Sequence, residues 1–317
     1  MLHKLLSTEI SQVHAELTAL LQAPDEDLNQ LFHDLQKSQG KMVRAQFCIL
    51  FAKIFQNAIN DKIIQMAANI ELIHLATLVH DDTIDHASMR RGQKSIQAKY
   101  GQELAIYAGD FLFAKYFEVL TKNFNDSNLT NIHLKTIQDI LTGELVQKNN
   151  LFNLNKTIST HQKIASLKTG SLFSLACQMG AYLNQETEEM QKYCAQIGLN
   201  IGLIFQMVDD LLDFEQDEQT VGKQTGQDIR NGNYTYPFII AYEHDPTWFN
   251  QHINNHLNEQ EAHEIIAKIY QLNGVQETKN YINKLLEETM NIIDKLPKTK
   301  ETKTLQKICK KLVSRSF

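Results

Sequence analysis

The chain has 317 residues and a formal net charge of −6, and 43% of its residues are hydrophobic and 21% charged. This length can bury a sizeable core, and the acidic balance disfavours a nucleic-acid partner, which usually requires a basic face. No apolar run approaches the roughly 18 residues that a membrane span needs. The N-terminal segment carries acids early, unlike a signal peptide, and the four cysteines form no C-x-x-C pair. We therefore expect a soluble cytoplasmic protein with reduced thiols and no transmembrane segment.

Helices are predicted along the whole chain. Only four prolines occur and none lies between residues 25 and 236, which suits long helices because proline breaks helix interiors. In two segments apolar residues recur at three- and four-residue steps over most of the helix surface, so these helices should be buried: 64–79 and 197–212. Polar stretches predict breaks at 121–128, 153–160, 183–187 and 215–233, and an amphipathic helix is expected at 275–296. The sequence therefore predicts one all-α domain over residues 1–317.

Two apolar helices end in the same pattern, D-D-x-x-D. The first is HDDTID at residues 80–85, and the second is VDDLLD at residues 208–213. The first and last aspartates of each pattern are four residues apart and therefore share a helix face. If the two helices pack side by side, their acidic ends could face each other across a cleft. The aspartates concerned are Asp81, Asp82, Asp85, Asp209, Asp210 and Asp213.

Carboxylates held this close repel one another and would take up protons unless cations lie between them. Mg²⁺ meets this need, since it typically binds one or two carboxylates and keeps waters and phosphate oxygens as its other ligands. A single pattern could be a solvated helix end, but two copies at the ends of buried helices argue against that. A calcium loop is disfavoured because neither pattern has alternating acids, a central glycine and a terminal glutamate.

Basic residues near the two patterns could bind phosphate groups. Arg90 and Arg91 follow the first pattern in HASMRRGQKS, and two adjacent guanidinium groups can grip two different anions. Lys168 lies inside the apolar segment SLKTGSLFSLA, where a buried lysine needs an anionic partner. The remaining basic candidates are Lys41 and Arg44 in GKMVR, and Lys223 and Arg230 in the glycine-bearing stretch 215–233.

Polar residues inside the apolar helices are further candidates. His74 and Thr77 lie close to the helix face of Asp81, and Gln206 lies three residues before Asp209. A lone histidine in an apolar helix can equally be a satisfied core residue. No nucleophile motif competes, because the chain has no G-x-S-x-G, no H-E-x-x-H, no G-x-G-x-x-G and no phosphate-binding G-x-x-x-x-G-K-[ST]. The residues therefore predict a protein that holds diphosphate through metal ions.

Together these motifs resemble the trans-isoprenyl diphosphate synthase (polyprenyl synthetase) family, and in particular its medium- and long-chain bacterial-type members. The resemblance spans roughly residues 40–240 and includes IHLATLVHDDTIDHASMRRG, FQMVDDLLDFEQD, GKQTGQDIRNGN, GKMVR, AGDFLFAKYF, GELVQ and the KTG at 168–170. It implies an all-α, isoprenoid-synthase-type helical bundle around a deep cavity. It also implies a prenyltransferase that condenses isopentenyl diphosphate head to tail onto an allylic diphosphate. The resemblance further implies a homodimer, or a hetero-oligomer with a small accessory subunit.

The resemblance also implies roles for individual residues. About three Mg²⁺ ions would be held once the allylic diphosphate is bound, by Asp81, Asp85 and Asp209 with support from Asp82, Asp210 and Asp213. The allylic diphosphate would be bound by Arg90, Lys168 and Lys223, and isopentenyl diphosphate by Lys41, Arg44, His74 and Arg91. Thr169 and Gln206 would lie near the reacting carbons. Two positions depart from the family pattern: the loop that often ends in glycine–lysine reads Gly232-Asn233, and the first glycine of the usual GGK is Gln39.

The length of the product is predicted from the residues one turn before Asp81. Ala76 and Thr77 are small there, so a growing tail should pass them. One helical turn is about 5.4 Å, comparable to one isoprene unit, and a product of roughly six to eight units (hexaprenyl to octaprenyl diphosphate, a quinone side-chain precursor) is expected. Larger residues deeper in the cavity would set the limit, with Phe111, Phe113 and Leu145 as candidates.

Three alternatives stay open at this point. A short-chain farnesyl or geranylgeranyl diphosphate synthase would share all these motifs. A terpene cyclase is disfavoured because its second metal motif typically combines Asn or Asp with Ser or Thr and Glu, whereas this chain has D-D-L-L-D. A non-catalytic partner subunit would have no reason to keep six carboxylates.

Overall fold

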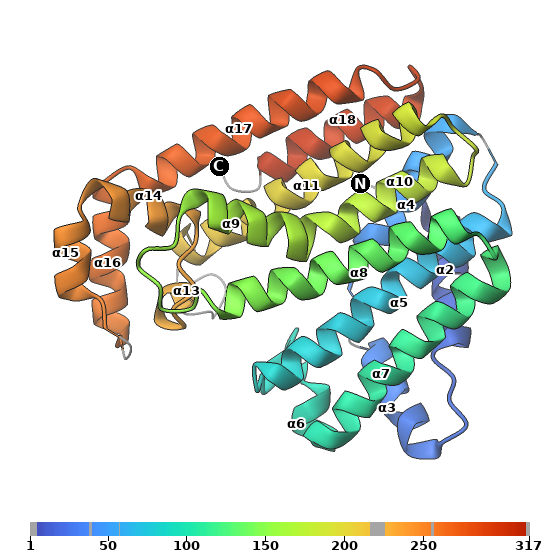
Figure 1. Cartoon of the computed structure of the whole chain (residues 1–317), viewed down its shortest axis with the longest axis horizontal. Coiled ribbons are helices and arrows are strands. Elements are labelled where there is room, and N and C mark those ends of the chain that lie inside the picture. Colours follow the sequence, from blue (N-terminus) through green and yellow to red (C-terminus); the bar gives the residue numbers. More distant parts are fainter. Residues whose placement is uncertain (1–4, 38–39, 57, 216–225, 255–256, 315–317) are drawn as a thin grey trace. The chain divides into compact units, whose positions relative to one another are not determined.

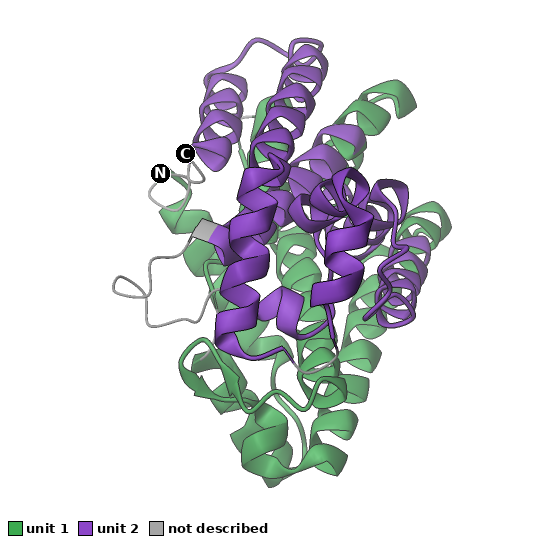
Figure 2. Ribbon diagram, turned by 90° about the vertical axis from the view of Figure 1, so that its left-hand side faces the viewer, with its two compact units in different colours: residues 1–134, 175–195 green, residues 135–174, 196–317 purple. Residues whose placement is uncertain are grey.

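The computed structural model describes residues 5–37, 40–56, 58–215, 226–254 and 257–314. The chain forms two compact units (Figure 2): unit 1 comprises residues 1–134 and 175–195, and unit 2 comprises residues 135–174 and 196–317. Helices α8 (Ser127–Lys148), α10 (Ser171–Tyr182) and α11 (Glu188–Glu215) contribute residues to both units. The described elements are almost entirely helical, which confirms the predicted all-α class (Figure 1). A single domain over the whole chain stays a prediction.

Unit 1 is organised around α5 (Asp61–Ile84), which packs against α2, α4 and α7. The side chain of Asn60 accepts a hydrogen bond from the backbone N–H of Ile63 and so caps the start of α5, and Asp85 ends it. The predicted buried helix at 64–79 is confirmed, because apolar residues of α5 are buried on nearly all sides. The other elements are α2 (Ser7–Leu20), α3 (Glu26–Lys37), α4 (Val43–Phe55), α6 (Ile96–Tyr100), α7 (Gln102–Val119) and the π-helix η1 (Leu120–Phe124).

By length and composition α5 could also cross a membrane, contrary to the expectation that no segment would pass that test. However, 72% of its apolar window is buried inside the structure. A helix that is hydrophobic on all sides is buried either in a protein core or in a membrane. The packing of α5 against its neighbours in unit 1 explains its apolar composition, so α5 is a core helix of that unit.

A short hairpin follows α5. Strands β1 (Met89–Arg90) and β2 (Gln93–Lys94) pair antiparallel, and the turn between them consists of Arg91 and Gly92 with φ angles of 49° and 77°. Two successive positive φ angles define the type I′ turn that matches the twist of a hairpin. Arginine adopts this conformation less readily than glycine, and such strain is often found at functional positions.

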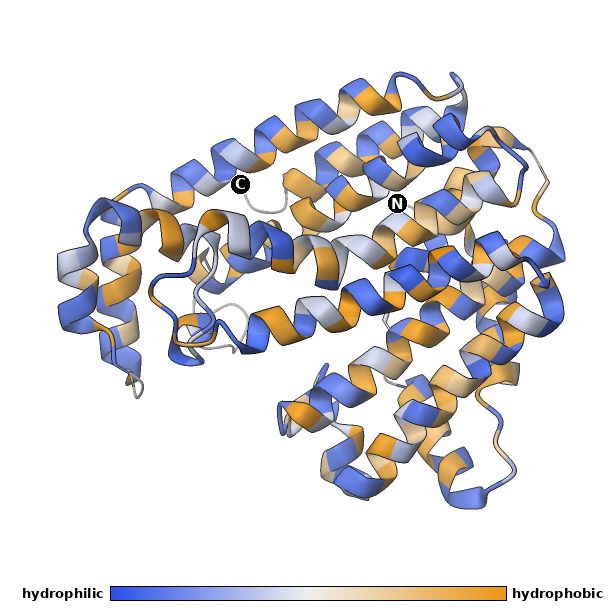
Figure 3. Cartoon of the chain, in the orientation of Figure 1, coloured by the Kyte–Doolittle hydropathy of each residue, from blue (hydrophilic) through white to orange (hydrophobic). Residues whose placement is uncertain are grey.

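Unit 2 contains the second long buried helix. The apolar side of α11 forms a core with α14 and the C-terminal helices, including Ile204, Met207, Leu211, Phe238 and Phe249. This confirms the buried helix predicted at 197–212. The predicted amphipathic helix at 275–296 corresponds to α17 (Gly274–Ile293), which carries both hydrophobic and hydrophilic residues (Figure 3) and buries residues mostly at three- and four-residue steps.

The remaining elements of unit 2 are short or of ordinary length. They are α9 (Ile158–Ala165), the π-helix η2 (Ser166–Gly170), α13 (Gln227–Arg230), α14 (Tyr236–His244), α15 (Pro246–His252), α16 (Glu259–Gln271), α17 (Gly274–Ile293) and α18 (Lys300–Val313).

Candidate active site

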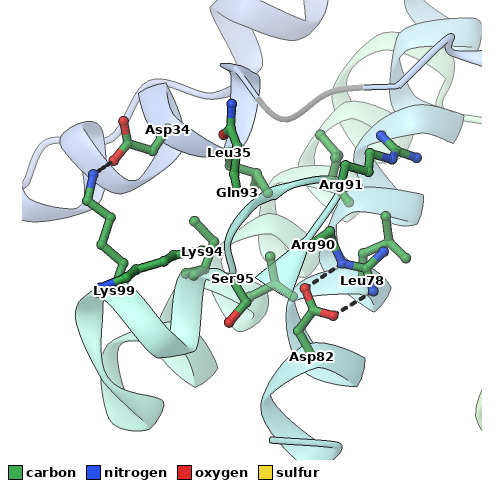
Figure 4. A pocket seen from close by; sticks show the side chains of 13 residues that line it. Asp34, Leu35, Leu78, Asp82, Arg90, Arg91, Gln93, Lys94, Ser95 and Lys99 are labelled. Atoms are coloured by element: carbon green, nitrogen blue, oxygen red, sulfur yellow. Dashed lines mark hydrogen bonds and ion pairs between the residues drawn. The ribbon is translucent and has the colours of Figure 1, made fainter. Parts of the chain in front are cut away.

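The first acidic pattern lies at the C-terminal end of α5. Asp82 is its buried member, and its two carboxylate oxygens accept hydrogen bonds from Arg90 of β1, one of them over 2.6 Å from Nη2 and the other from Nε (Figure 4). Asp81 is partly buried, and Asp85 is exposed. The geometry therefore gives Asp82 a protein partner of its own, and it fixes Arg90 beside the acidic helix end.

Three of the four residues expected to bind isopentenyl diphosphate lie near one another in unit 1. Burial lowers the pKa of His74, and the positive charges of Arg44 and Arg91 act in the same direction, so His74 is neutral. The guanidinium of Arg91 packs on Gly40, where an added Cβ would lie 2.7 Å from Arg91 Cζ. The fourth residue, Lys41, is exposed just before α4.

A buried carboxylate that the sequence analysis missed completes this cluster. Glu71 of α5 accepts a hydrogen bond from the backbone N–H of Ala45 over 2.9 Å. Burial raises the pKa of Glu71, and the nearby charge of Arg44 opposes that rise. Glu71 thus fixes the start of α4, and its charge interacts with that of Arg44. A glutamate between two apolar residues of a buried helix was the sequence signal for it.

Part of this basic region lines a pocket of about 370 Å³ in unit 1 (Figure 4). Arg90, Arg91 and Lys94 of the hairpin border it. On another side Asp34 of α3 accepts hydrogen bonds from Lys99 and from Tyr100 Oη, and Lys99 in particular lowers the pKa of Asp34 to about 2. This ionised contact ties α3 to α6. The cations of the hairpin then make the pocket suitable for an anionic group.

In unit 2 the predicted Lys168 and Thr169 lie in η2, a single π-helical turn of a kind that is frequent at functional sites. Lys168 Nζ donates hydrogen bonds to Glu144 Oε2 over 2.8 Å and to Gln147 Oε1 over 2.9 Å. Both acceptors belong to α8 and stand in the GELVQ segment. Gly143 permits this approach, since a Cβ there would lie 2.7 Å from the backbone N of Lys168.

A continuous set of polar contacts links η2 to the second acidic pattern. Thr169 Oγ1 donates to Gln206 Oε1 over 2.8 Å, and Gln206 Nε2 donates to Asp210 Oδ1 over 3.0 Å. The other oxygen of Asp210 lies 2.9 Å from His161 Nε2 of α9, and both of these side chains are buried. The structure therefore brings the predicted Thr169, Gln206 and Asp210 together and adds His161, which the sequence analysis did not select.

The other aspartates of the second pattern differ in their surroundings. Asp209 is exposed. Each carboxylate oxygen of Asp213 accepts a backbone N–H at the start of α13, from Gln227 over 3.1 Å and from Asp228 over 3.0 Å. Burial, reinforced by the charge of Asp210, raises the pKa of Asp228 to about 7. Lys223, expected to bind the allylic diphosphate, lies outside the described residues.

The two acidic patterns thus follow one plan. In each the second aspartate is buried against protein partners, while the first one is more accessible: Asp81 and Asp209. Accessible carboxylates are the hard oxygen ligands that Mg²⁺ prefers. Among the described residues no three His, Cys, Asp or Glu side chains are grouped closely enough to hold a metal ion by themselves. Such donors fit an ion that takes its other ligands from water and from a substrate phosphate.

The positions expected to control product length all lie on described helices. Ala76 is fully buried in α5, and the half-buried Thr77 donates a hydrogen bond to the backbone oxygen of His74. Phe113 of α7 stacks on His80. Leu145 of α8 is 62% exposed, so among the described residues its side chain does not close the end of a cavity.

The described residues thus combine two acidic helix ends with basic side chains near each of them. The family model for polyprenyl synthetases matches residues 25–273, and the chain therefore belongs to the polyprenyl synthetase family and is a prenyltransferase. It is similar to heptaprenyl diphosphate synthase component 2 of Bacillus subtilis, with 30% identity over all of this chain and 91% of that protein.

Solved structures agree with this assignment. The heptaprenyl diphosphate synthase of Staphylococcus aureus has a TM-score of 0.91 and 32% identity, and the alignment covers 98% of this chain and 99% of that one. The geranylgeranyl pyrophosphate synthase of Lactobacillus brevis has a TM-score of 0.90 and 29% identity, with 98% and 97% covered.

Proposed function

We propose that this prenyltransferase is a trans-polyprenyl diphosphate synthase that adds isopentenyl diphosphate units to an allylic diphosphate in a Mg²⁺-dependent reaction. The observation that carries the proposal is the shared plan of the two acidic helix ends. In each, protein partners hold the inner aspartate and leave the outer one accessible for a metal bound to diphosphate. Asp81, Asp85 and Asp209 would hold the ions, and Asp82, Asp210 and Asp213 would support them.

Bound Mg²⁺ would supply charge neutralisation for the departing diphosphate. Lys168 and Arg90 would bind the same diphosphate, with Lys168 oriented by Glu144 and Gln147. As the allylic C1–O bond breaks, C1 bonds to isopentenyl diphosphate, and the proton lost from that substrate passes to the released diphosphate. Thr169 would place its hydroxyl oxygen near the reacting carbons. No side chain of the protein has to act as a nucleophile in this reaction.

Isopentenyl diphosphate would be bound by the basic cluster of unit 1. Arg44 and Arg91 would grip its diphosphate, and Lys41, exposed at the edge, would add a third charge. Neutral His74 can donate one hydrogen bond without adding charge, because its ring stays unprotonated at pH 7. Glu71 would anchor the start of α4, the helix that carries Arg44, before the substrate arrives.

The product is proposed to contain about six to eight isoprene units, one unit per helical turn of about 5.4 Å. The small residues Ala76 and Thr77 support this length, as does the heptaprenyl product named for two similar proteins. The likeness to a geranylgeranyl pyrophosphate synthase favours the alternative of a shorter product. Mass spectrometry of the products made by the purified protein alone decides between them, and a product of three or four units would refute the long-chain proposal.

Assembly and location are part of the proposal. One face of α8 exposes Leu134, Leu141 and Leu145, which supports a homodimer. The relatives named "component 2" raise the alternative of a second, small accessory subunit. Light scattering on the pure protein, with turnover measured in the same sample, distinguishes an active homodimer from a chain that needs a partner. The enzyme is proposed to act in the cytoplasm.

The metal assignment is tested by removing one accessible carboxylate from each pattern. Asp81→Ala and Asp209→Ala should each abolish condensation while thermal unfolding stays close to that of the wild type, because each variant loses a Mg²⁺ ligand that is not part of the core. Asp294→Ala serves as the control, since Asp294 is exposed and its carboxylate contacts the side chains of Lys298 and Gln306 at the surface. An Asp81→Ala enzyme with near-normal turnover would contradict the assignment.

A further inference from the structure

A buried lysine lies beside the second acidic pattern and has no role in the reaction described above. Lys156, just before α9, is 4% exposed. Its Nζ donates a hydrogen bond to the backbone oxygen of Tyr234 over 2.7 Å and lies 3.5 Å from Asn233 Oδ1. A buried ammonium is costly unless charge or hydrogen bonds compensate it. Burial lowers the pKa of Lys156 to about 8, while the nearby charges of Asp210 and Asp228 act to raise it.

Asn233 connects this lysine to the carboxylates. Its Nδ2 donates to Asp228 Oδ1 over 3.0 Å, and its backbone N–H donates to the backbone oxygen of Asp228 over 2.8 Å. Asp228 in turn donates its own backbone N–H to Asp213. Lys156, Asn233, Asp228 and Asp213 therefore form one connected set, and any displacement of the lysine reaches the second acidic pattern through three hydrogen-bonded contacts.

We propose that Lys156 is a positioning residue that supplies the counter-charge for the second acidic pattern and holds the 226–234 segment in place. The role of Lys156 in the reaction rests on the proposed function, in which the second acidic pattern binds the metal ions that hold the allylic diphosphate. A lysine at position 233 would place a second ammonium beside that of Lys156, and like charges so close repel each other strongly. Asn233 and Lys156 are thus complementary: the site has room for one cation, and this chain carries it on residue 156.

If Lys156 had a structural role alone, a different experimental result would be expected. If Lys156 only satisfied the backbone oxygen of Tyr234, moving the positive charge to residue 233 would not restore what its removal costs. If the charge itself matters, then the two positions should be exchangeable. A charge-swap cycle separates these readings.

The cycle compares Lys156→Met, Asn233→Lys and the double variant in the full-length protein. Each single variant should raise the KM for the allylic diphosphate about tenfold or more, the effect expected when one charge-assisted contact is lost or opposed. The double variant should return to within about threefold of the wild type, while the KM for isopentenyl diphosphate, bound by residues of unit 1, stays within about twofold throughout. Lys163→Met, on the exposed side of α9, is the matched control.

Thermal unfolding without Mg²⁺ or substrate gives a second readout that does not depend on activity. Both single variants should unfold a few degrees below the wild type, and the double variant should recover most of that loss. A double variant no better than Lys156→Met in either readout overturns the inference, as does a double variant that fails to fold. If the wild type condenses no allylic diphosphate but the unfolding temperatures still show the recovery, the proposed function is wrong and the placement of the charge stands.

Discussion

Replacing Gly143 with alanine tests how closely the reaction depends on the approach of α8 to η2. The new Cβ would lie 2.7 Å from the backbone N of Lys168 and 3.1 Å from its Cα, whereas ordinary contact begins at 3.4 Å. The shortfall of about 0.7 Å is against backbone atoms, which cannot swing aside as a flexible side chain can. Either α8 or η2 must therefore move, and with it the contact between Lys168 and Glu144.

Stability and activity should respond by different amounts. Crowding of this kind costs about 1–3 kcal/mol, and alanine returns about 1 kcal/mol through its higher helix propensity. The net loss is at most about 2 kcal/mol, a few degrees in unfolding temperature for a chain of this size. A displacement of this order at a substrate-binding group can lower the rate by about a hundredfold. We therefore expect kcat/KM for the allylic diphosphate to fall by one to two orders of magnitude in a folded enzyme.

The assay measures condensation at varied allylic diphosphate and saturating isopentenyl diphosphate, with thermal unfolding by circular dichroism on the same preparation. Thr142→Ala is the matched control, because it changes the adjacent, exposed residue of α8 and gains helix propensity in the same way. A Gly143→Ala enzyme whose kcat/KM stays within twofold of the wild type would refute the idea that this helix contact positions Lys168.

Three further predictions follow from the structure. Ala76→Tyr and Thr77→Phe should shift the product to about three or four isoprene units with turnover retained, since each places an aromatic ring little more than one helical turn before Asp81. Unchanged product masses would count against the cavity path. Lys41→Ala should mainly raise the KM for isopentenyl diphosphate, and Arg90→Ala the KM for the allylic substrate; indistinguishable effects would contradict the division into two diphosphate sites. Burial lowers the pKa of His133 to about 3, below the value of about 6.5 in the unfolded chain, so its stabilising contribution should be complete above pH 6.5 and fall with the pH toward 3. His133→Leu should flatten the dependence of unfolding temperature on pH in that range, and an equally steep dependence would argue against a buried neutral histidine.

The fold was predictable where local pattern and tertiary burial agree. Apolar residues cover most of the surface of α5 and of residues 197–212 in α11, so periodicity alone identified them. Helices also end close to the breaks predicted at 121–128, 153–160 and 183–187, whereas much of the break predicted at 215–233 lies outside the described residues. Two elements were not foreseen. The hairpin at Arg91 and Gly92 has strands of only two residues, too short for any alternation to show. The π-helical turn η2 differs from an α-helix by a shift of hydrogen-bond partner that residue types do not reveal.

For the candidate site, the sequence could indicate candidate residues but not the partners that the structure gives them. Neighbouring residues on a helix point about 100° apart, so a D-D pair always has one inner and one outer member, and only packing decides which is which. Arg90, which is proposed to bind diphosphate, also donates hydrogen bonds to Asp82, and the sequence did not predict that partner. His161 and Lys156 were missed because both lie in the polar run at 153–163, where nothing distinguishes them from their neighbours. Their contacts with Asp210 and Asn233 depend on segments far apart in sequence.

The partners of the two inner aspartates point to a difference between the acidic patterns. Asp82 faces the guanidinium of Arg90, which carries a full positive charge at every accessible pH. Asp210 faces the neutral amide of Gln206 and the imidazole of His161, which is charged only when protonated. The first pattern thus has a permanent counter-charge, the guanidinium of Arg90 in the adjacent hairpin. The carboxylates of the second pattern depend instead on more distant basic side chains or on bound metal ions for a permanent positive charge. For that reason we expect the second pattern to be the more sensitive of the two to the concentration of Mg²⁺.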